Sequence, residues 1–121
     1  MAAATILIVD DDAAIRDLLS EVFELEGYRV ETAANGAEAL QRLEQVRPVL
    51  ILLDVTMPIL DGLGVAQELR RRGSPIPTLI LSALDEANRD AYVLGTRRLG
   101  KPFDLFVLLT MVECYCAGWQ C

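Results

Sequence analysis

Histidine is absent from the 121 residues of this chain, and other absences narrow its chemistry further. Without histidine the chain cannot build a Ser-His-Asp or Cys-His catalytic centre, or a zinc site that uses histidine. Basic residues are scarce, because 11 lysines and arginines stand against 18 aspartates and glutamates. The net charge of −7 argues against direct nucleic-acid binding, which clustered basic side chains usually mediate. Carboxylates, hydroxyls, lysine and thiols remain as candidate reactive groups.

Long apolar runs and a basic leader are also missing. No run approaches the roughly 18 residues that a membrane-spanning helix needs, so we expect no membrane association. The acidic residues 10–12 interrupt the first apolar stretch too early for a signal peptide. The three cysteines, Cys114, Cys116 and Cys121, form an odd cluster that is atypical of a disulfide framework and incomplete as a zinc site. These features fit a reducing, cytoplasmic setting.

Short apolar runs alternate with amphipathic segments along the whole chain. The β-branched-rich run Thr5–Val9 is typical of a strand buried on both faces of a parallel sheet. Further strands are expected over residues 28–33, 49–53, 78–81 and 97–100, with helices between them. This repetition predicts an α/β fold, a five-stranded parallel sheet flanked by helices on both faces. Since one domain usually takes about 100–200 residues, we expect residues 1–121 to form a single domain.

Two of the expected helices carry specific predictions about burial. In the first helix, one apolar stripe should face the core, formed by Ile15, Leu18, Leu19, Val22 and Leu25. The last helix, residues 103–117, is apolar nearly all round, whereas a helix packed on one face should alternate with charges. Because an apolar outer face usually marks an interface, we expect this helix to pair with another copy of the chain, as a homodimer, or with a partner.

Polar side chains follow the expected strands at the points where those strands end. The acidic residues 10–12 follow the first strand, while Asp54, Ser82 and Lys101 close later ones. Ligands of open parallel sheets bind beyond these strand ends. Neighbouring carboxylates resist ionisation unless a cation such as Mg²⁺ neutralises them. The set suits a phosphoryl group held by Mg²⁺, Lys101 and Ser82 while a carboxylate attacks phosphorus, although Asp12 alone is more simply a helix cap.

Four motifs that contain these residues resemble the receiver domain of two-component response regulators. The motifs are Ile6–Asp12, Leu52–Gly62, Leu81–Ala83 and Lys101–Phe103, and the resemblance covers nearly the whole chain. It implies a CheY-like receiver that is phosphorylated on Asp54 by a sensor histidine kinase or a histidine phosphotransfer protein. It further implies signalling through protein contacts, and no enzymatic activity beyond phosphorylation and dephosphorylation of its own aspartate.

The resemblance also implies a role for each residue of the site. Its cofactor is Mg²⁺, and the implied ligands are Asp10, Asp11, Asp54 and the backbone carbonyl of Thr56. Ser82 would hydrogen-bond a phosphoryl oxygen, and Lys101 would form an ion pair with the phosphoryl group.

The stretch between Ser82 and Lys101 departs from the pattern of this family. It is a few residues shorter, and the aromatic residue that usually precedes the lysine falls on Arg98 here. We therefore expect the helix near residues 86–94 to be shortened or irregular, and phosphorylation to be read out differently.

Two other functions stay open. A degenerate receiver would act as a phosphorylation-independent interaction or dimerisation module, which the altered stretch 83–100 allows. A haloacid-dehalogenase-like phosphohydrolase would use Asp10 as its nucleophile, because residues 10–12 have the spacing of its D-x-D motif. That enzyme family needs a second acidic pair after a later strand, where this chain offers only Asp85, Glu86 and Asp90 before Lys101.

Overall fold

A five-stranded parallel sheet forms the centre of the molecule. The computed structural model describes residues 4–54, 62–74, 76–83, 97–101 and 104–116. Within these ranges the strand order is β2-β1-β3-β4-β5 and every pairing is parallel. The strands are β1 (Thr5–Val9), β2 (Arg29–Ala33), β3 (Leu50–Asp54), β4 (Thr78–Ala83) and β5 (Arg97–Lys101). The predicted α/β architecture is confirmed.

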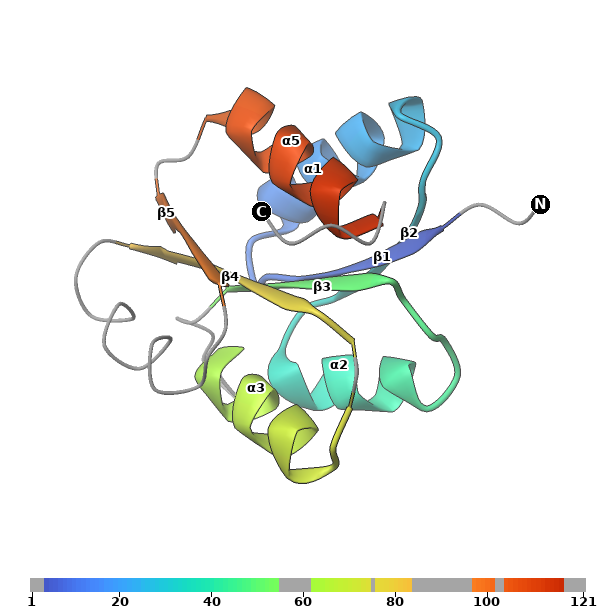
Figure 1. Ribbon diagram of the computed structural model, residues 1–121, viewed down its shortest axis with the longest axis vertical. Coiled ribbons are helices and arrows are strands. Elements are labelled where there is room, and N and C mark those ends of the chain that lie inside the picture. Colours follow the sequence, from blue (N-terminus) through green and yellow to red (C-terminus); the bar gives the residue numbers. More distant parts are fainter. Residues whose placement is uncertain (1–3, 55–61, 75, 84–96, 102–103, 117–121) are drawn as a thin grey trace.

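Helices cover both faces of this sheet. They are α1 (Ala13–Leu25), α2 (Gly36–Leu43), α3 (Gly62–Arg71) and α5 (Leu105–Cys116). Figure 1 shows α1 and α5 on one face and α2 and α3 on the other. The expected helix near residues 86–94 lies outside the described residues. No helix of the described ranges is long and apolar enough to cross a membrane.

The core consists of two clusters, one on each face of the sheet. Because successive strand residues point to opposite faces, β1 and β3 each supply apolar side chains to both clusters. On the face of α1 and α5, Leu19, Phe23, Leu108 and Val112 pack against the sheet. On the other face the helices contribute Ala39, Val65 and Leu69. This two-sided burial explains why the central strands read as continuous apolar runs.

The predicted core-facing stripe of α1 is wrong at two positions. Leu18 is 54% exposed and Leu25 is 81% exposed, whereas Leu19 and Phe23 are fully buried. Each residue turns a helix by about 100°, so the line through Ile15, Leu19 and Phe23 leaves Leu18 and Leu25 to one side. The apolar surface of α1 is therefore wider than the part that the sheet and α5 cover.

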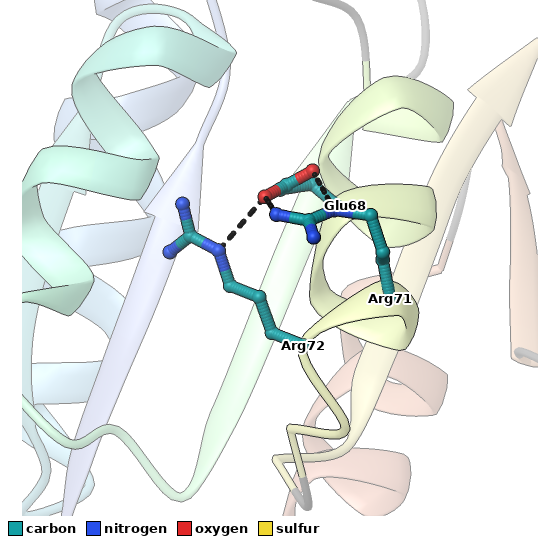
Figure 2. Close-up of polar contacts among 3 residues, drawn as sticks. All are labelled: Glu68, Arg71 and Arg72. Carbon is teal, nitrogen blue, oxygen red and sulfur yellow. Dashed lines mark hydrogen bonds and ion pairs between the residues drawn. The ribbon is translucent and has the colours of Figure 1, made fainter.

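The carboxyl end of α3 carries an ion-pair cluster on its surface (Figure 2). Arg71 donates to both carboxylate oxygens of Glu68, through Nε at 3.0 Å and Nη2 at 2.6 Å. Arg72 donates its Nε–H to the same carboxylate at 2.9 Å. These hydrogen bonds lower the pKa of Glu68 to about 2, and those from Arg71 have the larger effect. The helix ends at Arg71, and Gly73 follows with a φ of 69°, a conformation that glycine adopts without penalty.

The cysteines of α5 differ from the sequence expectation. Cys114 is disulfide-bonded, whereas Cys116 carries a free thiol. The sequence did not point to this bond, because an odd cluster of three cysteines is atypical of a disulfide framework. The two residues are two positions apart in a helix, so they project from different sides and have different neighbours.

Candidate functional site

The register of the central strands brings two predicted site residues to the same level. Val9 of β1 lies opposite Leu53 of β3, so the next residues along these strands, Asp10 and Asp54, also lie side by side. On its other side Asp54 is opposite Leu81 of β4. Asp54 thus ends the strand that lies between β1 and β4 in the sheet.

Ser82 and Lys101 come to this edge from the next two strands. Ser82 directly follows the partner of Asp54 in β4 and is opposite Gly100 of β5. Lys101 ends β5 opposite Ala83. The backbone therefore gathers the carboxylate, hydroxyl and ammonium residues at the carboxyl edge of the sheet. Ligands of this fold class bind at that edge.

Asp10 is the one buried charged residue among the described side chains, at 1% exposure. Its Oδ1 accepts a hydrogen bond from the backbone N–H of Asp12 at 2.9 Å. Its backbone N–H donates to the carbonyl of Ala33 at 3.1 Å. A carboxyl group without neighbouring donors or cations is costly to bury. These contacts fix the Asp10 carboxylate at the end of β1.

Asp11 and Asp12 follow in a different environment, because both are exposed. Asp12 is the N-cap of α1, and its Oδ1 accepts from the backbone N–H groups of Ala14 at 2.9 Å and Ile15 at 3.4 Å. The capping interpretation of Asp12 is confirmed. The three consecutive aspartates therefore divide into a buried carboxylate, an exposed one and a helix cap.

Arg16 is a positioning residue that the sequence did not single out. Its Nη1 donates to the backbone carbonyl of Asp10 at 2.7 Å, and its backbone N–H donates to the carbonyl of Asp12 at 3.0 Å. The first turn of α1 is thereby tied to the end of β1. An arginine one turn after an expected helix cap was the available signal in the sequence, but its partner depends on where the helix begins.

The donor chemistry of this edge fits Mg²⁺. The ion takes oxygen ligands from one or two carboxylates and keeps several waters. Asp10 and Asp11 supply two carboxylates at the end of β1, and Asp54 ends the adjacent strand. Among the side chains that the structure describes, no group of three potential metal ligands surrounds one point. Thr56, the predicted carbonyl ligand, lies outside the described residues, so the full ligand set stays a prediction.

The chain is similar to known proteins over most of its length. The family model described as the response regulator receiver domain matches residues 6–113. The response regulator MprA of Mycobacterium ulcerans is 43% identical over 111 residues, which are 89% of this chain and 48% of that protein. MprA of Mycobacterium leprae is 42% identical over 111 residues, again 89% of this chain, and 49% of that protein. The chain therefore spans about half the length of the curated relatives it matches.

Solved structures share the described fold. The receiver domain of the Francisella response regulator 1452 has a TM-score of 0.89 and 31% identity, over 95% of this chain and 98% of that one. The response regulator TrrA of Thermotoga maritima, in complex with Mg²⁺ and BeF, has a TM-score of 0.84 and 32% identity. That match covers 93% of this chain and 98% of the other.

Proposed function

Because the chain belongs to the response regulator receiver family of two-component signalling systems, we propose that it accepts a phosphoryl group on Asp54. The donor is a sensor histidine kinase or a histidine phosphotransfer protein, and residues 1–121 act as one receiver domain. The strand register carries this proposal, since it sets Asp54 beside the buried Asp10, with Ser82 and Lys101 at the same edge. Each of these residues alone is common at strand ends, and it is their common location that supports the proposal.

The chemistry assigned to these residues is nucleophilic displacement at phosphorus. The Asp54 carboxylate attacks phosphorus, the bond from phosphorus to the donor's histidine nitrogen breaks, and an acyl phosphate forms. The Lys101 ammonium pairs with one phosphoryl oxygen, and the Ser82 hydroxyl donates to another. Water later hydrolyses the acyl phosphate and restores the carboxylate. The domain thus modifies only itself, and its output is contact with other proteins.

Mg²⁺ is the cofactor of this proposal, held by Asp10, Asp11, Asp54 and the backbone carbonyl of Thr56. When bound, the ion neutralises charge on the phosphoryl oxygens. Asp10 contributes a carboxylate that is already fixed by the N–H of Asp12. Asp11 is exposed and open to an incoming ligand. The complex of the similar Thermotoga maritima protein TrrA with Mg²⁺ and BeF supports Mg²⁺ as the cofactor.

The outer face of α5 provides the proposed output surface. Phe106 is 81% exposed and Val107 is 46% exposed, in a helix whose other side is packed on the sheet. We propose that two copies of the chain pair through this helix, within the predicted range 103–117, because pairing would remove these side chains from water. We also propose that phosphotransfer and pairing take place in the cytoplasm. Phe106→Ser should lower the dimer fraction in sedimentation velocity, and a chain that stays monomeric at high concentration, with and without phosphorylation, contradicts the pairing.

Incubation with acetyl phosphate and Mg²⁺, followed by intact mass, tests the function. We expect the mass of one phosphoryl group to be gained by the natural chain and by Asp12→Asn, which keeps a helix cap. Asp54→Asn and chelation of the metal should abolish the gain. No gain from any donor, or a gain that survives Asp54→Asn, contradicts the proposal. Hydrolysis of a phosphate ester that survives Asp54→Asn and is lost in Asp10→Asn would identify a phosphohydrolase instead.

A further inference from the structure

The outer edge of β2 presents backbone groups that the sheet itself does not use. β2 is the first strand in the sheet order, so β1 is the one described strand beside it. The backbone N–H of Arg29 donates to the carbonyl of Ala4 at 2.8 Å, which directs the backbone groups of Arg29 toward β1. Because these groups alternate in direction along a strand, Val30 and Thr32 point theirs away from β1. Val30 and Thr32 therefore offer N–H and C=O groups to a further strand.

The edge of β2 lacks several of the features that usually prevent such pairing. Natural edge strands are protected by proline, by lysine, by a bulge or by a covering segment. β2 contains neither proline nor lysine, and its register with β1 is one-to-one over all 5 of its residues, so no bulge interrupts it. Arg29, Val30 and Glu31 line a groove beside the strand, through which solvent reaches the edge. The edge is therefore accessible to another strand.

Arg29 and Glu31 place opposite charges on either side of Val30. Being two residues apart in the strand, their side chains project to the same face of the sheet. Arg29 is exposed and Glu31 is half-buried, and neither forms an ion pair with another side chain in the described part of the chain. Opposite charges directly across two strands stabilise their pairing, and like charges destabilise it. A strand that pairs here should thus place an acidic residue opposite Arg29 and a basic one opposite Glu31.

A second copy of β2 meets this requirement when the two strands run antiparallel about a twofold axis at Val30. The backbone N–H of each Val30 then donates to the carbonyl of the other. Arg29 of each copy lies opposite Glu31 of the other, at the non-hydrogen-bonded positions where facing side chains are closest. An axis one residue later, at Glu31, would instead set two carboxylates against each other. The charge pattern therefore favours one register.

The other edge strand of the sheet, β5, does not have this property. It carries three basic residues, Arg97, Arg98 and Lys101, and no acidic one. In two antiparallel copies of β5 centred on Leu99, Arg97 would lie opposite Lys101. Like charges in that position oppose pairing. Of the two edges, β2 is therefore the one suited to a second copy of itself.

We propose that the edge of β2 is a second self-association surface, at which two copies of the chain pair antiparallel about Val30 and join their sheets into one. This surface lies at the edge of the sheet, whereas α5 covers one of its faces (Figure 1). It is also separate from the strand ends that carry Asp10 and Asp54, so it does not depend on phosphoryl transfer. Because contact along one strand edge is small, the pairing is reversible and depends on concentration.

Charge reversal in the Phe106→Ser chain tests this proposal, since that variant removes the contact proposed for α5. Sedimentation velocity at high concentration should show a reversible dimer of Phe106→Ser. Adding Arg29→Glu or Glu31→Arg sets like charges opposite each other, and should raise the dissociation constant of the dimer by about tenfold or more. Adding both substitutions together restores opposite charges at the same net charge as Phe106→Ser, and should restore the dimer.

The two single reversals also serve as partners for each other. Mixed in equal amounts, they should associate more strongly than either does alone, because each then meets the opposite charge; circular dichroism checks that every chain is folded. The proposal is overturned by a monomeric Phe106→Ser chain, by single reversals that dimerise as it does, or by a mixture that does not associate. Assemblies larger than a dimer, as pairing of β2 with β5 would give, also overturn it. Phosphorylation by acetyl phosphate is measured separately, so failure of this proposal is distinguishable from failure of the proposed function.

Discussion

Substituting Asp12 by alanine should weaken the fold without affecting phosphoryl transfer, because this carboxylate caps α1. Alanine removes the acceptor of the N–H groups of Ala14 and Ile15, which are bonded at 2.9 and 3.4 Å. Loss of a side-chain cap of this kind costs about 1 kcal/mol, within a range of about 0.5–2. Both N–H groups lie at an exposed helix end, where water replaces part of the lost bonding. We therefore expect about 1 kcal/mol and no more.

Asp12→Asn is the matched control for this variant. Asparagine caps helices about as well as aspartate, so it keeps the acceptor and removes only the charge at the positive end of the helix dipole. That charge contributes about 0.3–1 kcal/mol at an exposed site, and added salt screens it. Asp12→Asn should thus retain most of the stability, and its remaining deficit should shrink in high salt.

Urea unfolding followed by circular dichroism measures the free energy of unfolding of the natural chain and the two variants. The slope of that free energy against urea concentration should be the same for all three. The intact-mass phosphorylation assay is run on the same three proteins. The reasoning is refuted if Asp12→Ala unfolds like the natural chain. Complete loss of phosphorylation in folded Asp12→Ala would equally refute it, since Asp12 would then belong to the phosphoryl site.

Three further predictions follow from burial and charge. Phe23→Ala should lower the free energy of unfolding by about 3–5 kcal/mol, since Phe23 is fully buried. Leu25→Ala, at an 81% exposed position, should change that free energy by no more than about 0.5 kcal/mol. Similar urea midpoints for the two variants would contradict these burial assignments. Glu68 has a folded pKa of about 2 against an ordinary 4.5, so its contribution to stability is present above pH 4.5 and is lost as the pH falls toward 2. Glu68→Gln should therefore flatten the acid side of the stability profile, and an unchanged profile would count against the ion-pair cluster. Tyr28 should ionise near pH 12 in ultraviolet titration, and this step should be absent from Tyr28→Phe. Because the folded pKa of Tyr28 exceeds the ordinary 10.0, its contribution to stability is present below pH 10 and is lost as the pH rises toward 12.

The strands and the cap of α1 were predictable because their signals are local. A continuous run rich in β-branched residues, such as Thr5–Val9, is typical of a strand in a sheet covered on both faces. Asp12 precedes an amphipathic segment, and its side-chain oxygen can accept hydrogen bonds from the first N–H groups of a helix. The sequence alone therefore predicts that a helix begins after Asp12. The residues at the strand ends could be named for the same reason.

The covered face of α1 was not predictable in the same way. Leu18 and Leu25 are as apolar as Leu19, and periodicity cannot say which side of a wide apolar stripe the sheet covers. That choice depends on the angle at which the helix crosses the strands. The bond from Arg16 to the carbonyl of Asp10 also depends on tertiary placement, since it requires both the strand end and the first turn of α1.

The side-by-side placement of Asp10 and Asp54 requires the strand order, which is not written in the order of the chain. Alternating strands and helices predict parallel pairing, but several orders of five strands satisfy that pattern. The observed order places β1 between β2 and β3. The disulfide at Cys114 was not expected either, because three clustered cysteines are atypical of a disulfide framework.

The same strand order has a consequence for how the chain folds. β1 precedes both of its partner strands in the chain, since Ile6 lies opposite Val30 on one side and opposite Leu50 on the other. One edge of β1 pairs once β2 has followed, but the other edge waits for β3, and closing that longer loop slows folding. A nascent chain that ends before β3 would expose an unpaired apolar strand, which is prone to aggregate. Of the five described strands, β1 is therefore the one whose second edge waits longest for a partner.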